Sequence, residues 1–164
     1  MRTPLLRSAI ADLDAPWRTE IARLLPELLT AEPQLPRPEP LTERWQRQRL
    51  FEALARAVTV DARPKLLLID DLQWCDQETL AWLRFLLRFV PEAPLLLLGT
   101  VRTEEVEGDH PLHAFTRELQ VSKQLTTVEL LPLNATETAA LAAQVSDMQL
   151  DSAAVNHLVH ASEG

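Results

Sequence analysis

The stretch that most constrains this chain is residues 65–76, which read Lys-Leu-Leu-Leu-Ile-Asp-Asp-Leu-Gln-Trp-Cys-Asp. The four consecutive aliphatic residues 66–69 stand between Pro64 and two acids, a pattern typical of a parallel strand that is buried on both faces. Asp70 and Asp71 follow at its carboxyl end, which is where ligands bind in open α/β sheets. Two carboxylates there suit a hard cation such as Mg²⁺. The alternative is a buried strand that ends in a solvated acidic turn.

The residues that follow predict a β-α-β unit. Asp76 can cap a helix whose leucines recur at helical spacing, and a second aliphatic run follows at residues 95–98. The strands of such a unit are parallel and are joined by a right-handed crossover. Since the second strand leads directly into Thr100 and Arg102, we expect both side chains beside the acid pair.

These segments resemble a known family. Residues 70–76 (Asp-Asp-Leu-Gln-Trp-Cys-Asp), the helix after them and residues 96–102 (Leu-Leu-Leu-Gly-Thr-Val-Arg) are similar to the ATPase module of large bacterial multidomain signalling ATPases. These proteins form the STAND branch of the AAA-type P-loop NTPases, and the module is often found in LuxR-type transcriptional regulators. The resemblance covers roughly residues 42–164, and the first 40 residues match it only loosely.

The resemblance implies a role for each polar residue. Asp70 would be the Walker B residue that holds Mg²⁺, Asp71 would polarise the hydrolytic water, and Arg102 would be the sensor that reads the γ-phosphate. This assignment agrees with the chemistry, because phosphoryl transfer depends mainly on positioning and charge neutralisation. The alternative for Arg102 is a surface arginine that pairs with Glu104 or Glu105.

The phosphate-binding element of that family is missing from this sequence. A Walker A loop needs Gly-x-x-x-x-Gly-Lys and then Ser or Thr, so that backbone N–H groups surround the phosphates. The sequence has three glycines, and neither of its two lysines, Lys65 and Lys123, follows a glycine. We therefore expect ATP and Mg²⁺, with Thr100 and Arg102 at the nucleotide, in an intact parent protein, and neither of them bound to this chain alone. The chain would be a piece of such a module or a degenerate relative.

Composition narrows the possible partners. The formal net charge is −8 and the basic residues are scattered, which argues against direct binding to nucleic-acid phosphate. No apolar run approaches the roughly 20 residues that span a bilayer, so we expect no membrane contact and a cytoplasmic location. The single cysteine, Cys75, is expected to be a small reduced filler behind the acid pair. The four histidines, at positions 110, 113, 157 and 160, lack a third metal ligand and are expected on helix surfaces.

The rest of the chain predicts helices and one more strand. Residues 1–41 form a helical and proline-rich segment, and Thr42 is expected to cap a long helix that leads into the first strand. Arginines of that helix, at positions 44, 47, 49 and 56, form a basic face, for which we expect solvation, with a partner contact as the alternative. Residues 125–130 have strand composition, and Asn134 and Asp151 can cap two further helices.

We therefore predict an α/β fold of three layers over a single domain, residues 1–164. It would be a partial P-loop NTPase-like fold with a short, mainly parallel sheet whose strands lie near residues 66–70, 95–99 and 125–130. The function we favour is the core part of a nucleotide-dependent switch ATPase of a bacterial signalling or transcription regulator. The alternative is a noncatalytic interaction or scaffold domain derived from that fold.

The expected partners follow from the resemblance and from the sheet. The resemblance implies the rest of a parent polypeptide, namely a P-loop segment and the lid and winged-helix domains. In the resembled fold the strand order is 5-1-4-3-2, and the strands equivalent to 1 and 2 are missing here. Because apolar strand edges promote association, we expect residues 126–131 to pair with residues 95–98, or a second copy to pair with the sheet in a homodimer.

Overall fold

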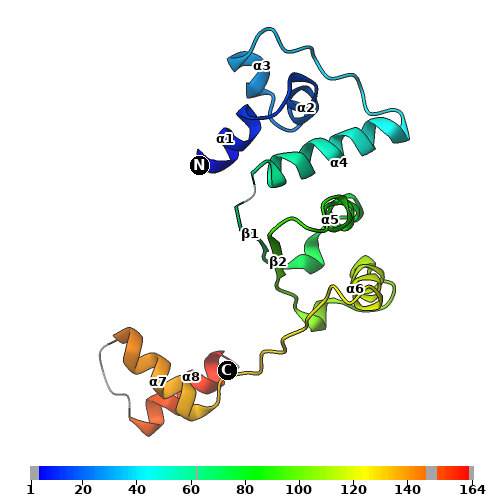
Figure 1. Cartoon of the computed structure of the whole chain (residues 1–164). Helices are drawn as coiled ribbons and strands as arrows, with labels where there is room; N and C mark the ends of the chain where they lie inside the picture. Colours follow the sequence, from blue (N-terminus) through cyan, green and yellow to red (C-terminus); the bar gives the residue numbers. More distant parts are fainter. Residues whose placement is uncertain (1–3, 62, 147–150, 163–164) are drawn as a thin grey trace. The chain divides into compact units, whose positions relative to one another are not determined.

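The computed structural model describes residues 4–61, 63–146 and 151–162. They fall into two compact units, Met1–Gln124 and Leu125–Gly164 (Figure 1). The single domain predicted over residues 1–164 stays a prediction, and the two units are described separately. Among the described residues, no helix is both long enough and apolar enough to cross a membrane.

The first unit begins with four helices: α1 (Pro4–Ala11), α2 (Ala15–Ile21), α3 (Glu27–Ala31) and α4 (Arg44–Thr59). Both α1 and α2 pack against α4. Their contact is an apolar cluster made by Ile10, Leu13, Ile21, Ala53 and Ala57. The proline-rich stretch before α4 therefore connects helices of one unit.

The start of α4 differs from the prediction by one residue. The N-cap is Glu43 rather than Thr42, and the Gln46 side chain accepts hydrogen bonds from the backbone N–H groups of both residues. The Glu43 side chain accepts the N–H of Gln46 in return. This reciprocal capping box satisfies more free N–H groups at the helix start than a lone threonine would.

Two parallel strands form the sheet. β1 (Lys65–Ile69) and β2 (Leu95–Gly99) pair in register from Lys65 opposite Leu95 to Ile69 opposite Gly99. They are connected by the 3-10 turn η1 (Leu72–Trp74) and by α5 (Gln77–Phe89). This arrangement confirms the predicted β-α-β unit.

Three helices pack in succession beside the sheet. After β2 come the 3-10 turn η2 (Thr103–Glu105) and α6 (Pro111–Val121). In this order, α4 packs on α5 and α5 packs on α6 (Figure 1). The apolar stripe of α5 is fully buried at its centre, where Leu80, Leu83 and Leu86 are at most 1% exposed.

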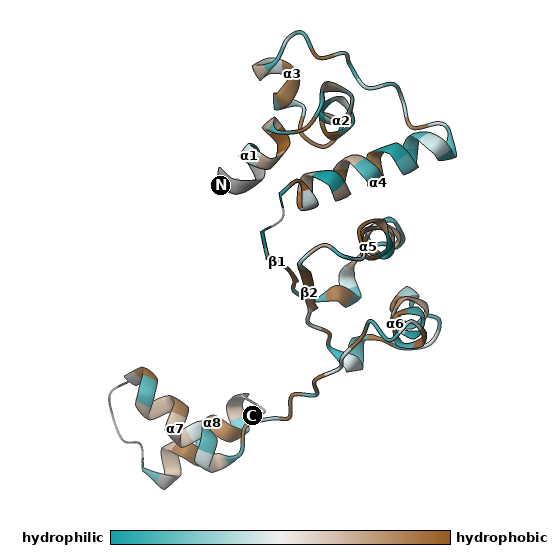
Figure 2. Ribbon diagram, in the orientation of Figure 1, coloured by the Kyte–Doolittle hydropathy of each residue, from teal (hydrophilic) through white to brown (hydrophobic). Residues whose placement is uncertain are grey.

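Within the described residues of the first unit, the sheet is covered on one face only. Four leucines of the other face, which are 47% to 64% exposed, are Leu66, Leu68, Leu96 and Leu98. Figure 2 shows both strands as strongly apolar. Within the first unit, the prediction that the strands are buried on both faces is therefore wrong, and the described residues of this unit supply no third layer. An aliphatic run indicates that a strand needs burial, but it does not say which segment supplies the cover.

The strand predicted near residues 125–130 is also wrong. Residues 125–134 have no regular structure, and β1 and β2 are the only paired strands in the described part of the chain. The predicted pairing of residues 126–131 with residues 95–98 is wrong for the same reason. Val128, Leu130 and Leu131 are at least 74% exposed. Strand propensity describes how well a side chain packs on a pleated sheet, and residues 125–134 pair with no strand of the described chain.

The second unit is a helical hairpin of α7 (Ala135–Ser146) and α8 (Ser152–Ser162), which pack on each other. Asn134 caps α7 and exchanges hydrogen bonds with Glu137, since its side chain accepts the Glu137 N–H and its own N–H donates to the Glu137 carboxylate. Asp151 caps α8 by accepting a backbone N–H at 2.8 Å. Both predicted caps are confirmed.

The one-sided burial predicts unequal effects of two leucine truncations. Leu83→Ala removes a side chain that is 0% exposed and should lower the free energy of unfolding by about 3 kcal/mol. Leu96→Ala truncates an exposed leucine and should change it by less than about 1 kcal/mol. Urea denaturation followed by circular dichroism measures both, and losses of similar size would contradict the open sheet face.

Candidate functional site

The acid pair lies in the loop that follows β1. The strand ends at Ile69, so Asp70 and Asp71 are beyond its last residue. Asp71 has φ 55° and ψ 56°, a left-handed conformation that Asp adopts more readily than most residues. Because Asp71 lies beyond the end of β1, the alternation of side-chain directions along a strand does not apply to it.

Thr100 joins the acid pair to the end of the second strand. The backbone N–H of Asp71 donates to Thr100 Oγ1 at 2.9 Å, and the Thr100 hydroxyl donates to Asp70 Oδ1. The Thr100 backbone continues the ladder, since its N–H donates to the carbonyl of Ile69 and its carbonyl accepts the N–H of Leu72. The predicted meeting of Thr100 with both acids is thus observed, and one hydroxyl contacts both residues.

Arg102 makes two ion pairs. Its Nε lies 3.3 Å from Asp71 Oδ1, as expected for a residue beside the acid pair. Its Nη1 lies 3.7 Å from Glu105 Oε1, which is the surface pairing that the sequence offered as the alternative. Since the Arg102 side chain is 57% exposed, such pairs contribute at most about 1 kcal/mol. The guanidinium can therefore exchange these carboxylates for another anion at little cost.

Gln73 is a site residue that the sequence analysis missed. Its buried side chain donates from Nε2 to Asp71 Oδ1 at 3.0 Å, and its Oε1 accepts the backbone N–H of Arg102 at 3.3 Å. It therefore fixes the Asp71 carboxylate and the chain after β2 together. Gln73 lies inside the Asp-Asp-Leu-Gln-Trp string, and only its identity as a polar residue between two apolar ones could have indicated this role.

Trp74 and Glu105 close the site on the side of η2. The indole N–H of Trp74 donates to Glu105 Oε2 at 2.8 Å, and the guanidinium carbon of Arg102 lies 6.0 Å from the Trp74 ring centroid. Two carboxylates and an aromatic face thus lie beside the exposed Arg102 guanidinium, and all three attract a cation. This arrangement could not be read from the sequence, because η1 and η2 are distant in the chain.

His110 fastens α6 to this cluster. Its Nδ1 accepts the backbone N–H of Leu112 at 3.2 Å, so we infer that Nε2 carries the proton and donates to the carbonyl of Gln73, 3.0 Å away. The expectation that this histidine lies on a helix surface is wrong, since it is the N-cap of α6. Both ring nitrogens therefore form hydrogen bonds with backbone groups.

Gly99 allows η1 to approach the end of β2. A Cβ atom at this position would lie 1.9 Å from Cδ1 of the buried Leu72, which is far inside van der Waals contact. Glycine therefore allows the turn that begins after Asp71 to pack on the strand end, where a larger residue would displace it.

The residues after η1 contribute structure rather than chemistry. Burial raises the pKa of the Cys75 thiol, and the neighbouring Asp76 carboxylate raises it further. A thiol that stays protonated is a poor nucleophile, which agrees with the predicted inert filler. The Asp76 side chain accepts the Thr79 N–H at 2.7 Å, and this hydrogen bond lowers the pKa of Asp76 and confirms the predicted cap of α5.

The donor set suits Mg²⁺ only together with a phosphate. Among the residues that the structure describes, no group of three or more His, Cys, Asp or Glu could hold a metal ion by itself. Mg²⁺ in nucleotide sites takes one or two carboxylates from the protein and completes its octahedron with water and phosphate oxygens. Asp70, hydrogen-bonded to Thr100, meets that smaller requirement.

The comparisons with known proteins identify the family. The model of the AAA ATPase domain matches residues 1–98, more than half of the chain. The chain belongs to the AAA ATPase domain family. Membership implies dependence on a nucleotide and Mg²⁺ in general terms. Neither the comparison with curated proteins nor the comparison with solved structures finds a match.

The extent of the match bears on the site residues. The AAA ATPase domain match includes the first 40 residues, which the sequence analysis related to the family only loosely, together with Asp70 and Asp71. It ends within β2, before Thr100 and Arg102. Only the contacts of Thr100 and Arg102 with the acid pair, and not the family match, therefore assign these two residues to the candidate site.

The contacts of Thr100 give a prediction about the acid turn. Thr100→Val removes the acceptor of the Asp71 N–H and should speed hydrogen exchange at that amide by about tenfold or more, because local opening then breaks one hydrogen bond fewer. Thr100→Ser keeps the hydroxyl and should leave the exchange rate near the original. Thr103→Val, in the neighbouring η2, is the matched control. If the valine and serine variants exchange equally fast, the hydroxyl does not hold the turn.

Proposed function

We propose that this chain is the core part of a nucleotide-dependent switch ATPase in a STAND-type bacterial signalling or transcription regulator. In this proposal Asp70 holds Mg²⁺, Asp71 orients the attacking water, and Thr100 and Arg102 contact the nucleotide. One observation carries it: in a chain of the AAA ATPase domain family, Thr100 hydrogen-bonds both acids at the carboxyl ends of two neighbouring parallel strands.

Each residue has a distinct task in this proposal. Mg²⁺, when bound, would neutralise charge on the phosphates, as it does generally in phosphoryl transfer. Gln73 donates to the Asp71 carboxylate, and Thr100 Oγ1 accepts the Asp71 backbone N–H, so the acid is positioned before a nucleotide arrives. Arg102 pairs with Asp71, and transfer of its guanidinium to a γ-phosphate would free that carboxylate to contact water. The exposure of the pair supports such an exchange.

We further propose that the rest of a parent polypeptide completes the site. The exposed leucine face and the open edges of the β1–β2 pair are the surfaces that a P-loop segment would cover, with the lid and winged-helix domains beyond it. Such a segment would bring the glycine-rich backbone and the lysine that this sequence lacks. A second copy of the chain, in a homodimer, is the other candidate to cover this face.

The second candidate function is a noncatalytic interaction or scaffold domain. It is favoured by the same Asp71–Arg102 pair, since the acid and the guanidinium satisfy each other without a nucleotide. The upstream sequence of the parent reading frame separates the two functions. A glycine-rich loop that ends in Gly-Lys-Ser or Gly-Lys-Thr supports the switch, and its absence supports the scaffold.

Two substitutions in a parent protein that has such a loop test the catalytic roles. Asp71→Asn should lower turnover by about 100-fold or more and leave MgATP binding intact, because it removes the charge that orients water. Asparagine also tolerates the left-handed backbone at this position. Asp70→Asn should instead raise the Mg²⁺ concentration that half-maximal activity requires.

The matched control is Glu104→Gln, which neutralises an exposed acid of η2 outside the contacts described above. Steady-state turnover and calorimetric nucleotide binding should both stay unchanged in this variant. Small and equal effects of all three substitutions would mean that the acid pair is only a solvated turn.

A further inference from the structure

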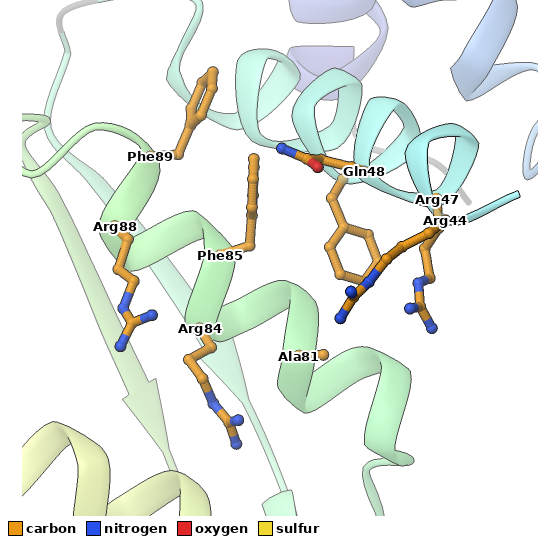
Figure 3. A pocket seen from close by; sticks show the side chains of 9 residues that line it. Arg44, Arg47, Gln48, Ala81, Arg84, Phe85, Arg88 and Phe89 are labelled. Atoms are coloured by element: carbon orange, nitrogen blue, oxygen red, sulfur yellow. The ribbon is translucent and has the colours of Figure 1, made fainter.

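A groove runs between α4 and α5 on the helical side of the first unit. It has a volume of about 550 Å³ and is open to solvent along one side (Figure 3). Its lining combines cations with aromatic rings, chiefly Arg44, Arg47, Arg84, Arg88, Phe51 and Phe85. None of these residues belongs to the candidate nucleotide site.

The floor of the groove is a row of three aromatic rings. The ring centroids of Phe51 and Phe85 lie 6.0 Å apart, and those of Phe85 and Phe89 lie 5.3 Å apart in a stacked pair. All three side chains are half-buried, so each ring leaves part of its apolar surface uncovered. Figure 3 shows Phe85 between the two helices. This floor can receive an apolar side chain from outside.

The rim of the groove carries excess positive charge. Arg84 and Arg88 share the single carboxylate of Glu118, and Arg47 pairs with Glu78 at 2.8 Å. Arg44 is exposed and forms no ion pair with any described residue. The four arginines of the groove therefore have two carboxylates as ion-pair partners among the described residues, so the groove is locally positive. The whole chain, in contrast, has a formal net charge of −8.

These features favour one class of occupant. A small molecule would leave much of its surface in water, because ligand pockets normally enclose most of a ligand and this groove is open. Nucleic acid is disfavoured since four arginines around an aromatic floor are not an extended basic stripe along a phosphate backbone. A peptide matches both components, with an apolar side chain on the rings and carboxylates on the guanidiniums.

We propose that the α4–α5 groove docks an acidic peptide segment of a partner protein, anchored by a bulky apolar side chain on Phe51 and Phe85. The exposed guanidinium of Arg44 binds a carboxylate of the partner, and the exposed Arg47–Glu78 pair can open to bind another. This surface is independent of the proposed ATPase function. Docking of this kind weakens as salt is raised, because its rim contacts are exposed to solvent.

The test uses a defined probe and the complete chain. The probe is a fluorescein-labelled peptide of Glu and Ala with one Phe and one Leu a helical turn apart, flanked on both sides by Glu. Fluorescence anisotropy should show saturable binding. Arg44→Glu should weaken it about tenfold, since it replaces attraction by repulsion at an exposed position that forms no ion pair with any described residue.

Two controls make the outcome decisive. Arg7→Glu changes the charge equally at an exposed site on α1 and should leave the affinity unchanged. A probe in which Phe and Leu are replaced by Ala should bind at least about fivefold more weakly, because it loses the contact with the rings. Circular dichroism checks that both variants fold.

Three results would overturn the proposal. The first is the absence of saturable binding, and the second is an equal loss of affinity in Arg7→Glu and Arg44→Glu. The third is binding of a fluorescein-labelled single-stranded oligonucleotide as tight as that of the peptide, with the same dependence on Arg44. The last result would assign the groove to nucleic acid.

Discussion

The first unit depends on the burial of one helix face. Leu80, Leu83 and Leu86 of α5 are almost completely excluded from water, and α5 packs on both α4 and α6. The same helix begins at Gln77, after its N-cap Asp76 and shortly after the turn that holds the acid pair, and residues on another of its faces line the groove. Its packing on α4 thus brings the arginines of the two helices to one groove.

In contrast to this well-buried helix, the sheet of the described chain has only two strands. Two parallel strands bury little backbone, and parallel sheets are normally covered on both faces. Four leucines on one face remain exposed, although the polar cluster at the strand ends is fully connected through Thr100 and Gln73. The acids are therefore held by hydrogen bonds at the strand ends. The leucine face of the sheet, which we propose a phosphate-binding segment covers, is exposed.

The sequence predicted the parts of this arrangement that depend on local rules. Aliphatic runs, helical spacing and the caps at Asp76, Asn134 and Asp151 identified the β-α-β unit and three helices, and the strand ends brought Thr100 and Arg102 to the acids. Prediction from the sequence failed where contacts with segments distant in the chain determine the local structure. Residues 125–130 have strand composition but pair with no strand of the described chain, and the contacts of Gln73, Glu105 and His110 connect turns that are distant in sequence.

In the ATPase site that we propose, this chain would supply the two acids and the arginine, while its sequence contains no Walker A loop to bind the phosphates. Calorimetric titration of MgATP into the chain tests this proposal most directly. The account predicts no saturable binding at nucleotide concentrations below about 1 mM, because the backbone amides and the lysine of a P-loop make most contacts with a triphosphate. Micromolar binding that Asp70→Asn abolishes would show that the chain holds a complete nucleotide site and would contradict the account.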